Sequence, residues 1–162
     1  MSNSRSFRQN AALALPLAVL ATAALPATAE ARMVRLTTTL KNYGGDGAYL
    51  AIYLTDASGK LQKTIRVAGS KAKYHKHLAG WFRQSGGRID GTTGASVGAG
   101  TTLKVSVDIA DALIDAGYQI RVDSAVEKEN DIPADVVAPL TSGNIGKPIA
   151  GKGYVRSLTI DM

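Results

Sequence analysis

The glycine-rich segment at residues 88–100 carries the side chains best suited to chemistry in this sequence. It reads RIDGTTGASVGAG, so hydroxyl groups and a carboxylate lie among glycines. Glycine adopts backbone angles that point successive N–H groups toward phosphate oxygens, which suits an anion-binding loop. The small residues Gly94 and Ala95 leave the hydroxyl of Ser96 open to a bulky reaction partner. The alternative interpretation is an exposed turn with no further role, because glycine and threonine are common in turns.

Short strands separated by turns are expected on both sides of this segment. Hydrophobic residues alternate with polar ones in LKVSVDI at residues 103–109, the period of a strand with one buried face. The same reasoning, with β-branched and aromatic composition, predicts six strands, at residues 33–40, 48–55, 60–68, 101–109, 117–126 and 153–160. Residues 139–153 are expected to form a loop that covers a sheet edge or a site.

One helical insertion is expected between the third and fourth strands, within residues 71–84. Its large apolar side chains have helical spacing, at Tyr74, Leu78, Trp81 and Phe82. The Gly86-Gly87 pair is expected to end the helix. Short strands with Gly-rich turns and a single helical insertion favour a mainly β fold over a parallel α/β sheet. We therefore predict an antiparallel immunoglobulin-like β-sandwich with one short helical insertion.

The first 31 residues have the layout of a secretory signal. Residues 2–10 are polar and include two arginines, residues 11–25 are uncharged and mostly apolar, and A-x-A patterns end at Ala29 and Ala31. We expect a signal peptide at residues 1–31, cleaved after Ala29 or Ala31, and a single β-sandwich domain at residues 32–162. With no cysteine for lipid attachment, the product is expected to be a soluble periplasmic protein that does not span the membrane after cleavage.

Composition and motifs exclude several classes of function. The formal net charge is +6, but the basic residues are scattered without a long run, so no nucleic acid is expected as a partner. The chain has no cysteine, which excludes a thiolate metal site and a cysteine nucleophile. It also has no Gly-x-Ser-x-Gly elbow, no His-Glu-x-x-His pair and no P-loop motif. Hydrolase and ATPase activities therefore receive no support.

The order of residues within the glycine-rich segment resembles a known attachment signal. Asp90, Thr93, Gly94, Ala95 and Ser96 fit the pattern D-x-x-T-G-A-S, which is similar to the signal of exported flavoproteins. In those proteins a flavin transferase esterifies the final Thr or Ser hydroxyl with the phosphate of FMN. The resemblance implies that Ser96 carries covalent FMN. Asp90 would either hold the loop by accepting hydrogen bonds from N–H groups or help to bind the metal of the transferase.

A longer stretch of the chain, about residues 35–130, resembles a family of exported bacterial domains of unknown function. The resemblance is carried by AYLAIYLTDASGKLQKTI, KYHKHLAGWFRQ, IDGTTGASVGAGTTLKVSVD and AGYQIRVDSAVEKE. Its most specific blocks are WFR at residues 81–83 and TGAS at residues 93–96. Members occur with PepSY-type membrane proteins and flavin transferases, which implies these two partners and a role in electron transfer.

Residues just before the motif have two interpretations each. Trp81, the only tryptophan, would either pack in the core or stack on the flavin ring. Five basic residues would either stabilise flavin phosphate or form a solvated face. They are Arg83, Lys71, Lys73, Lys76 and Arg88. His75 and His77 have no third ligand nearby and are expected to face solvent rather than hold a metal.

The sequence thus leads to two hypotheses from different classes. The first is a periplasmic flavoprotein that transfers electrons with a PepSY-type membrane reductase, an electron carrier rather than an enzyme with its own substrate. The alternative is an exported binding or accessory module without a cofactor, since immunoglobulin-like sandwiches serve many roles. Covalent flavin on Ser96 distinguishes the two.

Overall fold

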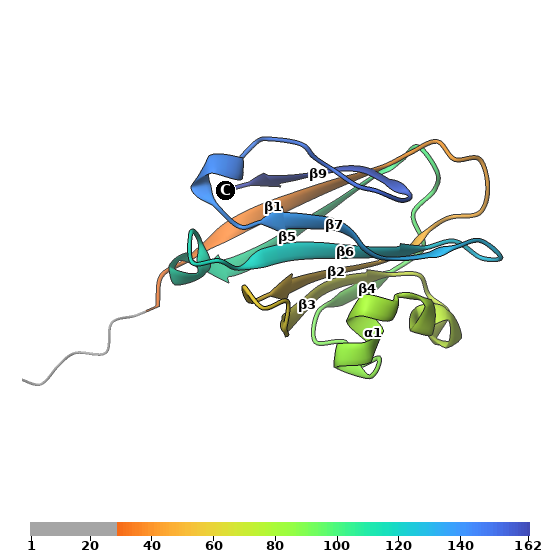
Figure 1. Ribbon diagram of the computed structural model, residues 1–162, viewed down its shortest axis with the longest axis horizontal. Helices are drawn as coiled ribbons and strands as arrows, with labels where there is room; N and C mark the ends of the chain where they lie inside the picture. Colours follow the sequence, from red (N-terminus) through yellow and green to blue (C-terminus); the bar gives the residue numbers. More distant parts are fainter. Residues whose placement is uncertain (1–28) are drawn as a thin grey trace, which may run out of the picture.

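The computed structural model describes residues 29–162, and within them nine strands form two stacked sheets (Figure 1). The first sheet has the order β5-β1-β9-β8 and is antiparallel throughout. Its strands are β1 (Ala31–Leu40), β5 (Thr102–Ala110), β8 (Ile149–Ala150) and β9 (Val155–Asp161). In β1, Val34 and Leu36 are fully buried while their chain neighbours Met33 and Arg35 are exposed, the alternation expected of a strand with one face in the core.

The second sheet has the order β4-β3-β2-β6-β7. Its strands are β2 (Tyr49–Thr55), β3 (Leu61–Ala68), β4 (Thr92–Gly94), β6 (Gln119–Ala125) and β7 (Asp131–Pro139). Only the short pairing of β4 with β3 is parallel; the other neighbours are antiparallel. Because β2 is central, both of its faces are covered, and all of its residues except Tyr49 are buried.

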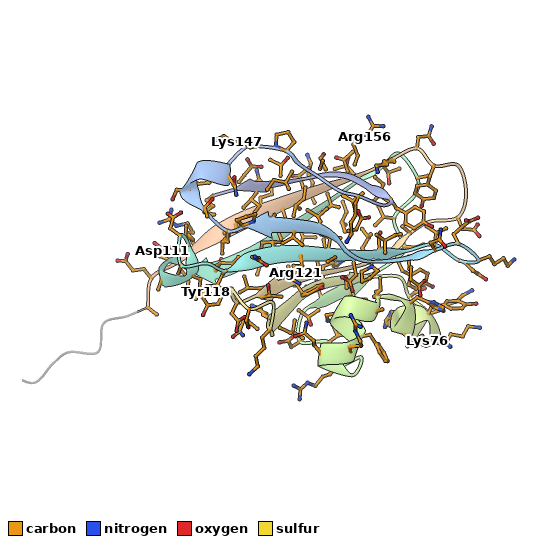
Figure 2. The ribbon with its side chains drawn as sticks, viewed as in Figure 1. Lys76, Asp111, Tyr118, Arg121, Lys147 and Arg156 are labelled. Atoms are coloured by element: carbon orange, nitrogen blue, oxygen red, sulfur yellow. The ribbon has the colours of Figure 1, made fainter. Side chains whose placement is uncertain are left out.

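The main core lies between the two sheets. Leu36 of the first sheet and Ile52 of the second are both fully buried members of one hydrophobic cluster, with side chains from every long strand. Side chains of both sheets fill the space between the ribbons, whereas Lys147 and Arg156 project outward over the first sheet (Figure 2). Lys76 projects from the helical segment on the opposite side. The predicted mainly β sandwich is confirmed.

The helical insertion covers the outer face of the second sheet (Figure 1). It consists of a 3-10 helix, η1 (Ala72–His77), followed by α1 (Ala79–Ser85). A second cluster of buried residues joins it to the sheet: Ala51, Tyr53, Val67, Leu78, Trp81 and Ala125. Gly86 caps α1 in the left-handed conformation, with φ of 62°, a geometry that glycine adopts without strain. The predicted short helix and its glycine end are confirmed.

Six strands were predicted and lie within one or two residues of β1, β2, β3, β5, β6 and β9. The prediction missed β4, β7 and β8. Strand β7 begins with a polar residue, Asp131, and contains Pro133 and Pro139. Proline is tolerated here because β7 is the last strand of its sheet. The segment at residues 139–153 is mostly loop, as predicted, with a 3-10 turn η3 (Ser142–Asn144) and the short edge strand β8. A further 3-10 turn, η2 (Asp111–Leu113), follows β5.

Most of the predicted signal peptide, residues 1–28, lies outside the described residues. Strand β1 begins at Ala31, which pairs with Ala110, and the carbonyl of Glu30 accepts a hydrogen bond from Asp111 N at 2.9 Å. Cleavage after Ala29 keeps both contacts, whereas cleavage after Ala31 removes them. Among the helices of residues 29–162, none is long and apolar enough to cross a bilayer.

Tyr53 carries a pH-dependent part of the stability. Burial raises the pKa of Tyr53 well above its ordinary value of 10.0. The Asp123 carboxylate, which accepts a hydrogen bond from the Tyr53 hydroxyl at 2.9 Å, raises this pKa further. Above pH 10 the unfolded chain loses the Tyr53 proton while the folded chain keeps it. The contribution of Tyr53 to stability is therefore fully present below pH 10 and is lost as the pH rises toward the pKa of the folded state. Tyr53→Phe is expected to lower the free energy of unfolding by about 1 kcal/mol at pH 8, and by clearly less at pH 11.

Urea unfolding of both proteins at the two pH values measures this difference, since ionisation of the other groups affects both proteins alike. An equal difference at pH 8 and pH 11 would contradict the assignment.

Candidate functional site

The predicted attachment motif lies along the edge of β3, where β4 forms the last strand of the second sheet. At its start, the Asp90 carboxylate accepts a hydrogen bond from Thr64 N at 2.8 Å. At the end of β4, the carbonyl of Gly94 accepts one from Gly69 N at 2.7 Å. Asp90 therefore holds the segment to β3. Of its two predicted roles, holding the loop and binding the metal of a transferase, this contact fits the first.

The end of the motif that follows Ser96 is fixed by Ala48, the residue before β2. Val97 is buried in the main core and exchanges two backbone hydrogen bonds with Ala48, at 2.8 and 2.9 Å. Between these anchors, Thr93, Ala95 and Ser96 are exposed. The segment thus presents a hydroxyl to solvent from a backbone that is hydrogen-bonded on both sides.

The hydroxyl of Ser96 lies directly against a glycine. A Cβ atom built on Gly47 would be only 2.8 Å from Ser96 Oγ and 3.2 Å from Ser96 Cβ, closer than such atoms normally approach. Gly47 therefore leaves the space that the Ser96 side chain occupies. Within residues 29–162, no side chain is hydrogen-bonded to Ser96 Oγ, which is exposed.

Arg66 lies against the motif at Gly94 and was not identified by the sequence analysis. Its Nε is buried and has no hydrogen-bond partner within residues 29–162, and its guanidinium lies so close to Gly94 that a Cβ there would overlap Nη2. A buried, unpaired N–H of a cation is costly unless it is satisfied. The one sequence signal was an arginine within the otherwise apolar end of a strand, TIRVA. Arg66 therefore presents an unsatisfied guanidinium N–H beside Gly94.

Trp81 does not reach the surface. Its side chain is 0% exposed, its indole N–H donates to Thr64 Oγ1 at 2.8 Å, and its backbone N–H donates to Asp123 at 2.7 Å. Of the two interpretations given above, core packing fits these contacts. The indole has no exposed face on which a flavin ring would stack, and we leave Trp81 out of the proposed site.

Arg83 and Arg88 are exposed, but they lie toward the Leu61 end of β3. Gln84, next to Arg83, accepts a hydrogen bond from Leu61 N at 2.7 Å, and Arg88 lines a surface hollow with Leu61 and Asp90. Ser96 instead follows the opposite end of the strand, beyond Ala68. The structure therefore does not bring these two arginines to the Ser96 hydroxyl.

The prediction that both histidines face solvent was wrong for His75. It is only 7% exposed, its Nε2 bonds to the carbonyl of Gly69 at 2.8 Å, and its ring packs between Tyr49 and Trp81. His77 is half-exposed and pairs with Asp131 at 2.9 Å. No group of three or more possible metal-binding side chains occurs within residues 29–162.

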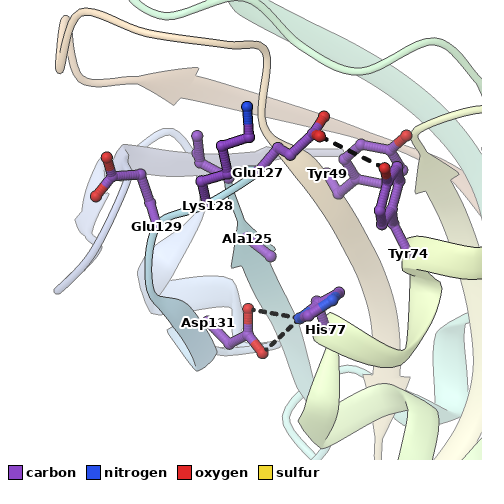
Figure 3. Close-up of a pocket in the computed structure, with 9 residues that line it drawn as sticks. Tyr49, Tyr74, His77, Ala125, Glu127, Lys128, Glu129 and Asp131 are labelled. Atoms are coloured by element: carbon purple, nitrogen blue, oxygen red, sulfur yellow. Dashed lines mark hydrogen bonds and ion pairs between the residues drawn. The ribbon is translucent and has the colours of Figure 1, made fainter.

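A pocket of about 280 Å³ opens on the outer face of the second sheet (Figure 3). Tyr49 and Tyr74 form one wall, and Ala125 and Val126 contribute an apolar surface. The rim is polar and contains His77, Glu127, Lys128, Glu129 and Asp131. The Tyr74 hydroxyl points to Glu127 Oε1 at 3.4 Å, and the His77–Asp131 pair lies at a separate part of the pocket lining (Figure 3). Such a pocket suits a flat ligand with one apolar and one polar edge.

Fold and site together define a class: a β-sandwich domain with an exposed serine hydroxyl on a glycine-rich sheet edge, beside an aromatic pocket. Residues 31–157 match the family model described as "Predicted periplasmic protein (DUF2271)", so the chain belongs to this family. The description agrees with the periplasmic location and the exported family expected from the sequence. No curated protein and no solved structure matches the chain.

Proposed function

We propose that this protein is a periplasmic electron carrier that holds FMN as a phosphate ester of Ser96. The observation that carries the proposal is the exposed Ser96 hydroxyl on a segment anchored by Gly69 and Ala48. An attachment site must be open to a transferase and still fix the position of its product. Ser96 meets both needs, since its side chain is exposed while its backbone neighbours are hydrogen-bonded into the sheet.

Two features of the motif and its neighbours support a phosphate at this site. Arg66 offers a buried Nε without a partner, and glycine at positions 47 and 94 leaves room where a Cβ would collide with Ser96 or Arg66. A guanidinium hydrogen bond to phosphate is among the strong polar contacts in proteins. We assign Ser96 the role of covalent anchor and Arg66 the role of phosphate partner.

Attachment requires one displacement at phosphorus, catalysed by a flavin transferase. Ser96 Oγ gives its proton to a base of the transferase and bonds to the flavin-side phosphorus of flavin adenine dinucleotide. The phosphoanhydride bond breaks, and AMP leaves. Once bound, the flavin supplies the ability to accept and pass on one or two electrons. In this proposal a PepSY-type membrane reductase is the redox partner.

The test is the intact mass of the mature protein, measured under denaturing conditions after coexpression with a flavin transferase from the same organism. We expect an increase equal to FMN minus water, located on the peptide that contains Ser96. An unchanged mass would reject the proposal and favour a binding module without cofactor.

Removing the positive charge next to Gly94 is expected to slow attachment. Arg66→Met matches the unbranched stem of the side chain as far as Nε but has no N–H donors, and a hydrogen bond to a charged group is worth about 1.5–3 kcal/mol. We expect the rate of flavin attachment to fall by about tenfold or more. The measurement is the fraction of loaded protein over time by mass spectrometry.

Lys63→Met is the matched control, because Lys63 is an exposed cation on the same strand. It is expected to load at the wild-type rate. Equal rates for the Arg66 and Lys63 variants would show that Arg66 does not bind the phosphate.

A further inference from the structure

Ser96 and the aromatic pocket open on the same face of the second sheet. Ala48 and Leu50 face the main core, so the alternation of side chains along the chain turns Gly47 and Tyr49 to the outer face. Ser96 Oγ lies against Gly47. Two residues along a strand span about 7 Å, which is the step from Gly47 to the pocket wall at Tyr49.

Glycines keep the path between Ser96 and the pocket free of side chains. The Tyr49 ring packs on Gly69, where a Cβ would overlap it, and Gly69 N donates to the carbonyl of Gly94. Gly47 lies against Ser96 Oγ and Gly69 lies against the Tyr49 ring, and neither residue adds a side chain between the motif and the pocket wall. The pocket wall and the motif are therefore in contact through Gly69.

The shape and chemistry of the pocket match a fused aromatic ring with a polar end. Tyr49 and Tyr74 meet edge to face, with ring centroids 5.7 Å apart, so the Tyr49–Tyr74 wall presents both an aromatic face and an edge. Tyr49 lies opposite Ala125 on β6, which gives an apolar floor. His77 and Glu127 supply polar groups at the rim.

We propose that the pocket formed by Tyr49, Tyr74 and Ala125 binds the isoalloxazine ring of the FMN held on Ser96. This inference rests on the proposed function and adds the position of the ring. The methyl-substituted benzene end of isoalloxazine suits the tyrosines and Ala125, and its pyrimidine end suits the polar rim. The ribityl phosphate arm, with carbon–carbon bonds of about 1.5 Å, covers the step from Ser96 to Tyr49.

The test is the protection of flavin fluorescence from iodide in the loaded protein. We expect the iodide quenching constant of the wild-type protein to be severalfold lower than that of its own flavopeptide after proteolysis. Tyr74→Ser is expected to raise the constant severalfold, toward the value of the flavopeptide. Tyr74→Phe keeps the aromatic face and is expected to retain the protection.

Tyr118→Ser is the matched control, because Tyr118 is also half-buried but lies next to the opposite end of β6. It is expected to leave the quenching constant unchanged. A normal mass increase with equal quenching of wild-type protein and flavopeptide would overturn the ring-binding inference alone, whether or not the Tyr74 variants fold. An unchanged mass would overturn the proposed function and this inference together.

Discussion

Alanine in place of Ser96 is expected to remove all covalent FMN from the protein, whereas threonine is expected to retain it. The alanine methyl group has no nucleophilic oxygen, so no ester forms. Threonine keeps the hydroxyl, and its additional methyl group is accommodated because position 96 is exposed to solvent. The measurement is intact mass after coexpression with the transferase, together with in-gel flavin fluorescence.

The loss must come from chemistry and not from unfolding. Ser96 is exposed and has no hydrogen-bonded side-chain partner within residues 29–162, so its removal is expected to change the free energy of unfolding by less than about 0.5 kcal/mol. Thr93→Ala removes a neighbouring exposed hydroxyl and is expected to keep full loading. Flavin retained in the Ser96→Ala protein, but lost with Thr93→Ala, would move the attachment site to Thr93.

Local patterns predicted the elements that depend on neighbouring residues. The alternation in β5 and the spacing of Leu78 and Trp81 follow from which face of each element is buried. The left-handed cap at Gly86 follows from the lack of a side chain. These features are set within a few residues of the chain, so sequence alone was enough to indicate them.

Features that depend on distant residues escaped the sequence analysis. Arg66 lies beside the motif because the parallel pairing of β3 with β4 brings Gly94 next to it. His75 is buried because Gly69 supplies a carbonyl and Tyr49 a ring face. Neither partner can be read from the residues adjacent to His75 or Arg66. The motif itself was local, which is why Ser96 could be selected while its phosphate partner could not.

Asp123 on β6 has a fully buried carboxylate that needs hydrogen-bond donors. Its carboxylate accepts hydrogen bonds from Tyr53 Oη at 2.9 Å, Trp81 N at 2.7 Å and Ala134 N at 2.8 Å. Leu78, the residue that precedes α1, offers no side-chain cap, so Asp123 satisfies an N–H that the helix cannot. The carboxylate thus ties β2, α1 and β7 to β6.

Close approach of α1 to this carboxylate depends on Gly80. A Cβ built on Gly80 would be 2.8 Å from Asp123 Oδ2 and 3.1 Å from the Tyr53 hydroxyl oxygen. Glycine in a helix costs about 1 kcal/mol relative to alanine, and this weakness was visible in the sequence. The structure gives the reason for it, because only glycine lets the first turn of α1 approach the Asp123 carboxylate.

Asp123→Ala is therefore expected to lower the free energy of unfolding by about 3 kcal/mol or more. It leaves two buried donors, Tyr53 Oη and Trp81 N, and the partly buried Ala134 N without an acceptor. Each unsatisfied buried group costs about 1–3 kcal/mol; the total stability of a domain is only about 5–15 kcal/mol. Urea unfolding followed by the fluorescence of Trp81 reports directly on this contact. Asp108→Ala, an exposed carboxylate on β5, is the control and is expected to change stability by less than about 0.5 kcal/mol. A loss below about 1 kcal/mol for Asp123→Ala would mean that water or a rearranged α1 satisfies the three donors.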